Sequence, residues 1–264
     1  MRGAVDVRER EREREREMDM EIDEPQKTDD EACTLTDDEL FRAAEAGKIG
    51  VLRQLSGDEI ARASSLRNED GRSLLHVAAS AAQTEVVDYL SSLEQFSGCI
   101  NSKDEEGWAP LHSAASSGRV DILEILLNRG GDINLTNNGG RTALHYAASK
   151  GWLKMAEVLI SHGAKINKKD KVGCTPLHRA ASTGNIELCE FLIEEGAEVD
   201  ALDRSGQTPL MHAVICENKQ VALLLIRHGA DVDVEDKEGY TVLGRASEDF
   251  RLSLIDAAKA MLEG

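Results

Sequence analysis

A phrase of about ten residues returns along this chain at a nearly constant interval, and this period limits the possible folds more than any other feature. It reads GRTALHYAAS from Gly140 and GCTPLHRAAS from Gly173. The glycine that opens the phrase stands at six positions, with spacings of 36, 33, 33, 33 and 33 residues: Gly71, Gly107, Gly140, Gly173, Gly206 and Gly239. A seventh copy, without the glycine, starts at Leu40 as LFRAAEAGKIGVLRQL. A unit of this length cannot bury its apolar face alone, so a stack of similar units is expected.

The residues within the phrase predict a turn followed by two antiparallel helices. Proline occupies the first helical position, where no backbone N–H is needed, in three copies: Pro110, Pro176 and Pro209. A glycine, which adopts a positive φ at little cost, follows the first helix in three copies: Gly118, Gly151 and Gly184. The next segment, for example VDILEILLNRG, carries aliphatic residues at helical spacing. Since a period of 33 with a T-P-L-H phrase is typical of ankyrin repeats, we predict an all-α ankyrin-repeat solenoid of seven helix-turn-helix units with β-turn tips.

Seven such units account for residues 35–264 and leave a tail at residues 1–34. The approximate repeat boundaries are 35–67, 68–103, 104–136, 137–169, 170–202, 203–235 and 236–264. The tail contains VRERERERERE followed by an acidic stretch with few apolar residues, which predicts a disordered charged segment. Because a dinucleotide repeat in the message would encode alternating Arg and Glu, we hypothesise that translation starts at Met18 or Met20.

Charge and cysteine usage limit the partners and the compartment. The 264 residues carry a formal net charge of −18, which argues against binding to nucleic acid or to an anionic membrane. The five cysteines are odd in number and form no C-x-x-C pair, as expected in a reducing compartment. No apolar run is long enough to span a bilayer. We expect a monomer in the cytoplasm and the nucleus.

One histidine returns in four successive copies and could be a metal ligand, a catalytic base or a structural element: His76, His112, His145 and His178. We favour the structural interpretation, in which each imidazole hydrogen-bonds the adjacent turn, because no cysteine stands at ligand spacing. The series stops at Met211 and Gly244, which a scaffold tolerates near its end and an active site would not. We therefore predict no enzyme and no catalytic, metal or cofactor site. The remaining alternative is a metal held by this histidine series.

The residues that vary from copy to copy predict a protein-binding surface. Positions after the motif glycine and at the end of each first helix are not needed for the fold. The candidate partner-binding residues are Arg72, Trp108, Ser117, Arg141, Lys150 and Arg179. Trp108 is either an interface anchor or a residue that packs on the next turn. Seven basic and two acidic residues lie between Arg141 and Lys171, and this basic centre suits a partner of opposite charge.

Three stretches resemble the gankyrin family of ankyrin-repeat chaperones: EEGWAPLHSAASSGR, TALHYAASKG and the ending MLEG. The resemblance implies a non-enzymatic assembly chaperone of the proteasome regulatory particle. Such a protein binds the C-terminal domain of a proteasomal AAA ATPase subunit in its concave groove. On this resemblance, Arg72, Trp108 and Lys150 match residues that face the ATPase. The 36-residue spacing, the tail and HAVICE in place of L-x-C-x-E depart from the family. The alternative is an ankyrin adaptor that inhibits a kinase or a transcription factor.

Overall fold

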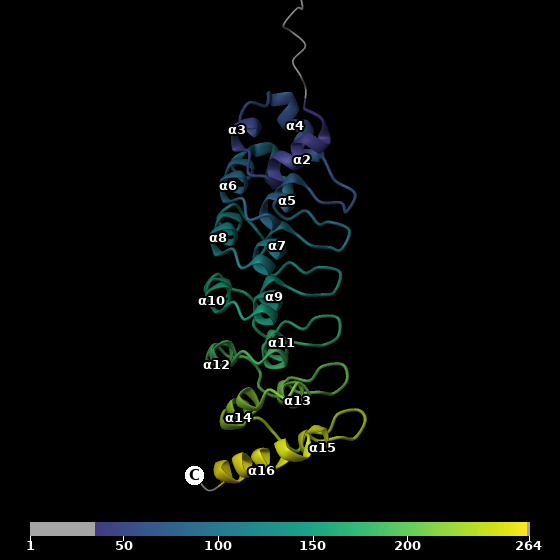
Figure 1. The fold of residues 1–264 in the computed structure, drawn as a ribbon, viewed down its shortest axis with the longest axis vertical. Helices are drawn as coiled ribbons and strands as arrows, with labels where there is room; N and C mark the ends of the chain where they lie inside the picture. The colour runs from purple at the N-terminus through teal and green to yellow at the C-terminus, as the bar shows by residue number, and fades with distance from the viewer. Residues whose placement is uncertain (1–34, 263–264) are drawn as a thin grey trace, which may run out of the picture. The chain divides into compact units, whose positions relative to one another are not determined.

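Pairs of antiparallel helices stack in chain order, each pair beside the next (Figure 1). The computed structural model describes residues 35–262, and every regular element within this range is a helix. Residues from Thr36 onward form one unit. The predictions of a disordered tail and of a start at Met18 or Met20 lie outside the described residues.

The five central units each contain two helices of similar length. The first helices are α5 (Leu74–Ser80), α7 (Pro110–Ser117), α9 (Ala143–Lys150), α11 (Pro176–Thr183) and α13 (Pro209–Ile215). The second helices are α6 (Thr84–Ser92), α8 (Val120–Asn128), α10 (Leu153–Ser161), α12 (Ile186–Glu194) and α14 (Lys219–Arg227). Figure 1 shows the first helices in one layer, the second helices in another, and the turns projecting from the far side of the first layer. We call the side formed by the turns and first helices the turn face.

Small residues explain why the first helices stack so closely. Ala147 and Ala148 in α9 are fully buried, as are Ala180 and Ala181 in α11. An alanine methyl keeps the helices near each other, and the aliphatic second helices complete the core. Within the described residues, no helix has the length and apolarity needed to cross a bilayer.

The turn between the two helices needs a left-handed residue in every central unit. The predicted glycines adopt it, with φ of 71° at Gly118, 73° at Gly151 and 78° at Gly184. Ala82 and Glu217 occupy the same place in two other units, with φ of 60° and 58°. A residue with a Cβ is strained there by about 1 kcal/mol, so the stacking geometry imposes this turn even where glycine is missing.

The first unit departs from the predicted two helices. It contains α2 (Asp37–Glu45), the short α3 (Ile49–Leu52) and an additional helix, α4 (Gly57–Ser65). The additional helix begins at Ser56, whose backbone N–H donates to Glu59 Oε2 over 2.8 Å. In return, the Glu59 N–H donates to Ser56 Oγ over 3.4 Å, which completes a capping box.

The unit with the 36-residue spacing and the last unit also differ from the regular helix pair. The extra residues form a 3-10 helix, η1 (Glu94–Cys99), whose Phe96 is fully buried. The Cys99 thiol donates to the Ser64 carbonyl of α4 over 3.1 Å. The last unit has a short first helix, α15 (Val242–Arg245), and a long second one, α16 (Glu248–Leu262).

Candidate functional site

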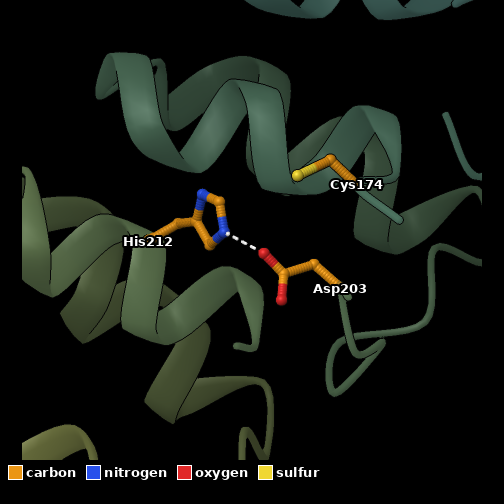
Figure 2. A group of neighbouring side chains, drawn as sticks. All are labelled: Cys174, Asp203 and His212. Atoms are coloured by element: carbon orange, nitrogen blue, oxygen red, sulfur yellow. Dashed lines mark hydrogen bonds and ion pairs between the residues drawn. The ribbon is translucent and has the colours of Figure 1, made fainter. Parts of the chain in front are cut away.

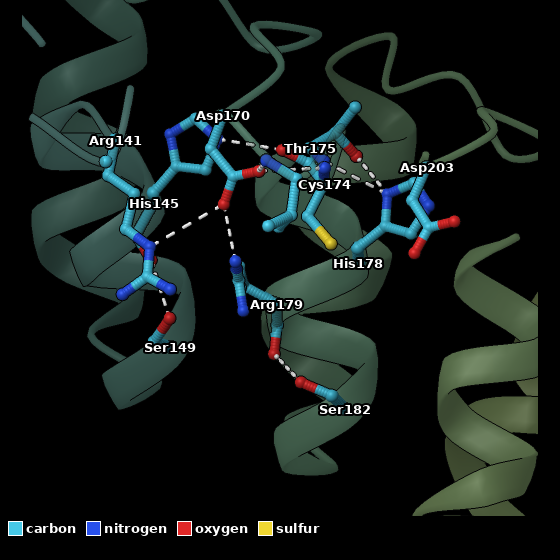
Figure 3. Close-up of polar contacts among 12 residues, drawn as sticks. Arg141, His145, Ser149, Asp170, Cys174, Thr175, His178, Arg179, Ser182 and Asp203 are labelled. Carbon is cyan, nitrogen blue, oxygen red and sulfur yellow. Dashed lines mark hydrogen bonds and ion pairs between the residues drawn. The ribbon is translucent and has the colours of Figure 1, made fainter. Parts of the chain in front are cut away.

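The four recurring histidines form a buried series, which we call the imidazole row: His76, His112, His145 and His178. All four side chains are fully buried. In the third, Nδ1 of His145 accepts the backbone N–H of Thr142 over 3.1 Å, and Nε2 faces the Cys174 carbonyl of the next unit over 3.1 Å (Figure 3). An Nδ1 that accepts an N–H carries no proton, so Nε2 is protonated and donates to the carbonyl.

Burial fixes the charge state of this row. It lowers the pKa of His112, His145 and His178 from 6.5 to about 4, against the raising effect of the carbonyl each one bonds. These imidazoles are therefore neutral near pH 7, and both ring nitrogens are engaged by the backbone. The prediction that they hydrogen-bond the adjacent turn is confirmed.

A second series of polar side chains follows the turns. We call it the turn-acid row: Asp104, Asn137, Asp170, Asp203 and Asp236. In each, Oδ1 accepts the backbone N–H of the residue four positions later, at distances between 2.7 and 3.0 Å. This bond shapes the turn and leaves the other terminal atom of the side chain free to bind a neighbour.

In four of these five units, the turn residue has a partner nine positions later in the same unit. The Asn137 amide donates to the Tyr146 hydroxyl over 2.8 Å, and Arg245 Nε donates to Asp236 Oδ2 over 2.7 Å. In the units between them, the same position holds Arg179, which pairs with Asp170, and His212, which pairs with Asp203. The chemistry of this partner thus changes from unit to unit while its place stays constant.

A further partner reaches the row from the preceding turn. Arg72 Nε lies 3.3 Å from Asp104 Oδ2, and Arg141 Nε lies 3.6 Å from Asp170 Oδ2. Asp170 therefore has a guanidinium on each side (Figure 3). Burial raises the pKa of this carboxyl, but the Arg179 guanidinium and the turn N–H groups bind the charged form more strongly and hold the pKa below its usual value. The result is one buried anion with two partly exposed cations, a local excess of positive charge.

The structure places the six predicted partner-binding residues in three settings. Arg72, Arg141 and Arg179 bind the turn-acid row. Trp108 is half-buried and packs on Tyr146 of the next unit, with ring centroids 4.5 Å apart, so the packing alternative describes its place in the fold. Ser117 and Lys150 are exposed at the ends of their helices; the Ser117 hydroxyl donates to the Ser113 carbonyl over 2.8 Å. Among the described residues, Lys150 has no hydrogen-bond or ion-pair partner.

Sequence reasoning missed the turn-acid row, although a signal was present. An aspartate or asparagine stands three positions before the motif glycine in six copies, as in DKVG and DRSG. Reasoning also missed a cluster on this row, formed by Cys174, Asp203 and His212, whose ligand-type atoms all lie within 4.8 Å of one another (Figure 2).

Taken together, the stacked helix pairs and the varied side chains on one face define a repeat scaffold for binding. A family profile described as Ankyrin repeats (3 copies) matches residues 40–137, 129–203 and 195–264. The chain belongs to the ankyrin-repeat family, and the predicted solenoid is confirmed. A comparison with curated proteins gave no match. Ankyrin repeats indicate a protein–protein interaction adaptor, and the fold is typically a non-enzymatic binding scaffold.

Proposed function

We propose that this protein is a non-enzymatic assembly chaperone of the proteasome regulatory particle. It acts as a monomer in the cytoplasm and the nucleus, and it binds the C-terminal domain of a proteasomal AAA ATPase subunit through its turn face. Membership of the ankyrin-repeat family supports a protein partner. The stretches that resemble gankyrin support this particular partner.

The observation that carries the proposal is the cationic centre of the turn face. Arg141 and Arg179 share the buried Asp170 and keep 41% and 21% of their side chains exposed. A guanidinium has five N–H donors, so each arginine retains donors for an acidic partner while one of its nitrogens is held. Because Asp170 already orders both side chains, less conformational entropy is lost when a partner binds.

Lys150 extends this centre along α9. It is exposed and ends the helix whose preceding turn carries Arg141. Within a chain of net charge −18, such a local cationic surface favours a partner whose acidic groups face it. An ATPase domain with an acidic surface satisfies this requirement.

The test is a double variant, Arg141→Gln with Lys150→Glu. Arg179 still pairs with Asp170 in this variant, so the turn keeps its internal bonds. We expect affinity for the purified ATPase C-terminal domain to fall by about tenfold or more, because close charge pairs across an interface are worth at least 1.5 kcal/mol. Binding is measured by calorimetry, with circular dichroism to show that helical content is unchanged.

The matched control is Lys154→Glu with Lys165→Gln, which changes the net charge by the same amount. Lys154 lies on α10, in the second-helix layer, and Lys165 lies in the loop that follows this helix, outside the cationic centre. The control is expected to bind as the unmodified protein does. Unchanged binding by the Arg141→Gln, Lys150→Glu protein would contradict the assignment of the turn face.

Co-purification separates this proposal from its alternative. Tagged protein expressed in cells is expected to capture assembly intermediates that contain the ATPase subunit, with little mature proteasome. Capture of a kinase or a transcription factor instead, lost in the same double variant, would favour the adaptor alternative.

A further inference from the structure

Three side chains on the turn face point toward one another at the junction of the fifth and sixth units (Figure 2). Cys174 belongs to one turn, Asp203 to the next turn, and His212 to α13. A ring nitrogen of His212, Nε2, lies 3.1 Å from Asp203 Oδ2. The set of one sulfur, one nitrogen and one oxygen ligand atom lies within 4.8 Å.

The same three places in the preceding unit hold a different set. Arg141, Asp170 and Arg179 stand there, so two guanidiniums surround the carboxylate. One unit later, the two arginine places hold Cys174 and His212. The carboxylate of Asp203 is as firmly placed as that of Asp170, yet a thiol and an imidazole have replaced both fixed cations. A metal ion between Cys174, Asp203 and His212 would supply the positive charge that the two arginines supply in the preceding unit.

Hydrogen bonds to the backbone hold two of these groups in position. Asp203 Oδ1 accepts the N–H groups of Ser205 over 2.7 Å and Gln207 over 2.9 Å, which leaves Oδ2 directed at the cluster. The Cys174 N–H donates to Asp170 Oδ1 over 3.0 Å, and the Cys174 carbonyl accepts His145 Nε2 over 3.1 Å. Bonds of this kind orient metal ligands and increase their affinity.

The third group is held by ring packing. The imidazole of His212 packs edge-on against the buried ring of His178, with centroids 5.0 Å apart. Since His178 is itself fixed by the imidazole row, the His212 ring has a rigid support. The three groups therefore come from three segments that the stack holds in register.

The donor set selects the class of metal. Thiolate and imidazole suit Zn²⁺, whereas Mg²⁺ and Ca²⁺ prefer oxygen alone. A tetrahedral zinc site places its ligand atoms about 3.3–3.6 Å apart. The imidazole nitrogen and the carboxylate oxygen, 3.1 Å apart, already have nearly this spacing, and the Cys174 sulfur lies within 4.8 Å of both. Burial raises the pKa of the Cys174 thiol to about 11, so metal binding there displaces a proton.

We propose that Cys174, Asp203 and His212 bind one Zn²⁺ ion, with a fourth coordination position open to solvent. The side chains of Asp203 and His212 are 8% and 19% exposed, which gives the ion an entry path. The site is independent of the proposed chaperone function, and its test uses the metal alone.

The experiment titrates the reduced, chelator-treated full chain with Zn²⁺ by calorimetry and with Co²⁺ by absorption spectroscopy. One ion per chain is expected, with a thiolate-to-Co²⁺ charge-transfer band and the visible bands of tetrahedral Co²⁺. Cys174→Ser should abolish the charge-transfer band and weaken Zn²⁺ binding by about tenfold or more. Cys216→Ser is the matched control, because Cys216 is an exposed thiol outside the cluster, and it should keep the band.

Two further variants preserve the fold with residues that the chain itself uses at these places. His212→Arg introduces the residue type of Arg179, and Asp203→Asn introduces that of Asn137, whose Oδ1 shapes the turn equally well. Each should weaken Zn²⁺ binding by about tenfold or more while helical content stays constant. Zn²⁺ affinity and a Co²⁺ charge-transfer band that survive Cys174→Ser would overturn the site, as would failure of the unmodified chain to bind either ion.

Discussion

The imidazole row and the turn-acid row run along the same stack and differ in what changes between units. In the imidazole row the residue is the same four times, it is fully buried, and its Nε2 faces a backbone carbonyl in every copy. In the turn-acid row the turn residue is nearly constant, but its partner is tyrosine, arginine or histidine.

The difference shows how the scaffold separates architecture from recognition. Replacing a buried side chain that satisfies backbone groups is costly within the stack, because an unpaired buried polar group costs about 1–3 kcal/mol, and the row ends only where Met211 and Gly244 take the position. A partly exposed side chain that binds one turn residue can be exchanged for another of suitable reach. The variable partners of the turn-acid row are therefore the positions where one unit of this chain differs from the next in the chemistry that it offers to a partner.

We expect acid to produce the largest loss in the free energy of unfolding, and we expect the imidazole row to cause it. With folded-state pKa values of about 4 and a usual value of 6.5, the unfolded chain takes up these protons first as the pH falls. The stabilisation that comes from keeping these imidazoles neutral is thus complete above about pH 6.5, and it is lost as the pH falls from there toward 4. At pH 5.5 each of the three histidines contributes a loss of about 1.4 kcal/mol, so the sum is about 4 kcal/mol relative to pH 7.5.

Urea unfolding of the reduced, metal-free protein at the two pH values measures this loss. The pKa values of Asp170 and Asp236 are held below their usual value, so these two carboxyls do not contribute in this range. A free energy of unfolding that stays constant between pH 7.5 and 5.5 would show that the row protonates without cost and would remove the distinction between the two rows.

The next largest loss of stability is expected from Asp170→Ala, which removes a turn residue of the turn-acid row and not one of the variable partners. The change leaves the N–H groups of Val172 and Cys174 without their acceptor and places Arg141 and Arg179 beside each other with no anion between them. We expect a loss of about 2–3 kcal/mol in the free energy of unfolding.

The matched variant Asp170→Asn keeps the acceptor and loses only the charge, as Asn137 does in the preceding unit. A loss of about 1 kcal/mol is expected, because the bonds to the turn remain. Equal losses for the two variants, measured by urea unfolding, would mean that the charge pairs and not the turn bonds stabilise this region.

The smallest effect distinguishes two neighbouring histidines, His178 of the imidazole row and His212, which pairs with Asp203 of the turn-acid row. His178→Met should cost about 2 kcal/mol, because the Gln207 carbonyl and the Thr175 N–H lose a buried partner. It should also reduce the pH dependence, since one of the three histidines with a pKa of about 4 is gone. His212→Arg should change the free energy of unfolding by less than about 0.5 kcal/mol, because arginine already fills this place in two other units. Similar costs for the two substitutions would contradict the separation of roles.

Much of the fold could be predicted from the period alone. The helix pairs, the proline at the start of the first helix and the glycine after it follow from local backbone preferences. The role of the recurring histidine also followed from its position, because a residue repeated at one place in a stack must meet the same surroundings each time. The additional helix α4 escaped prediction, since the first unit lacks the motif glycine and its second helix is only four residues long.

The candidate sites were less accessible from sequence. Arg141 comes from the unit before that of Asp170 and Arg179, and nothing in their spacing shows that two cations share one anion. Cys174, Asp203 and His212 fit no ligand motif, because 29 and 38 residues separate the cysteine from its two neighbours. Such pairings depend on how far one turn is displaced from the next.

The sequence by itself determined the repeat, the helix boundaries within each central unit and the architectural use of the imidazoles, because those are set by short-range preferences that act within a few residues. Only the tertiary structure decided which side chain meets which across the stack. That depends on the packing of buried alanines and leucines between units, which brings distant turns to within hydrogen-bond distance and converts separate polar residues into a cationic centre and a cluster of metal-ligand type.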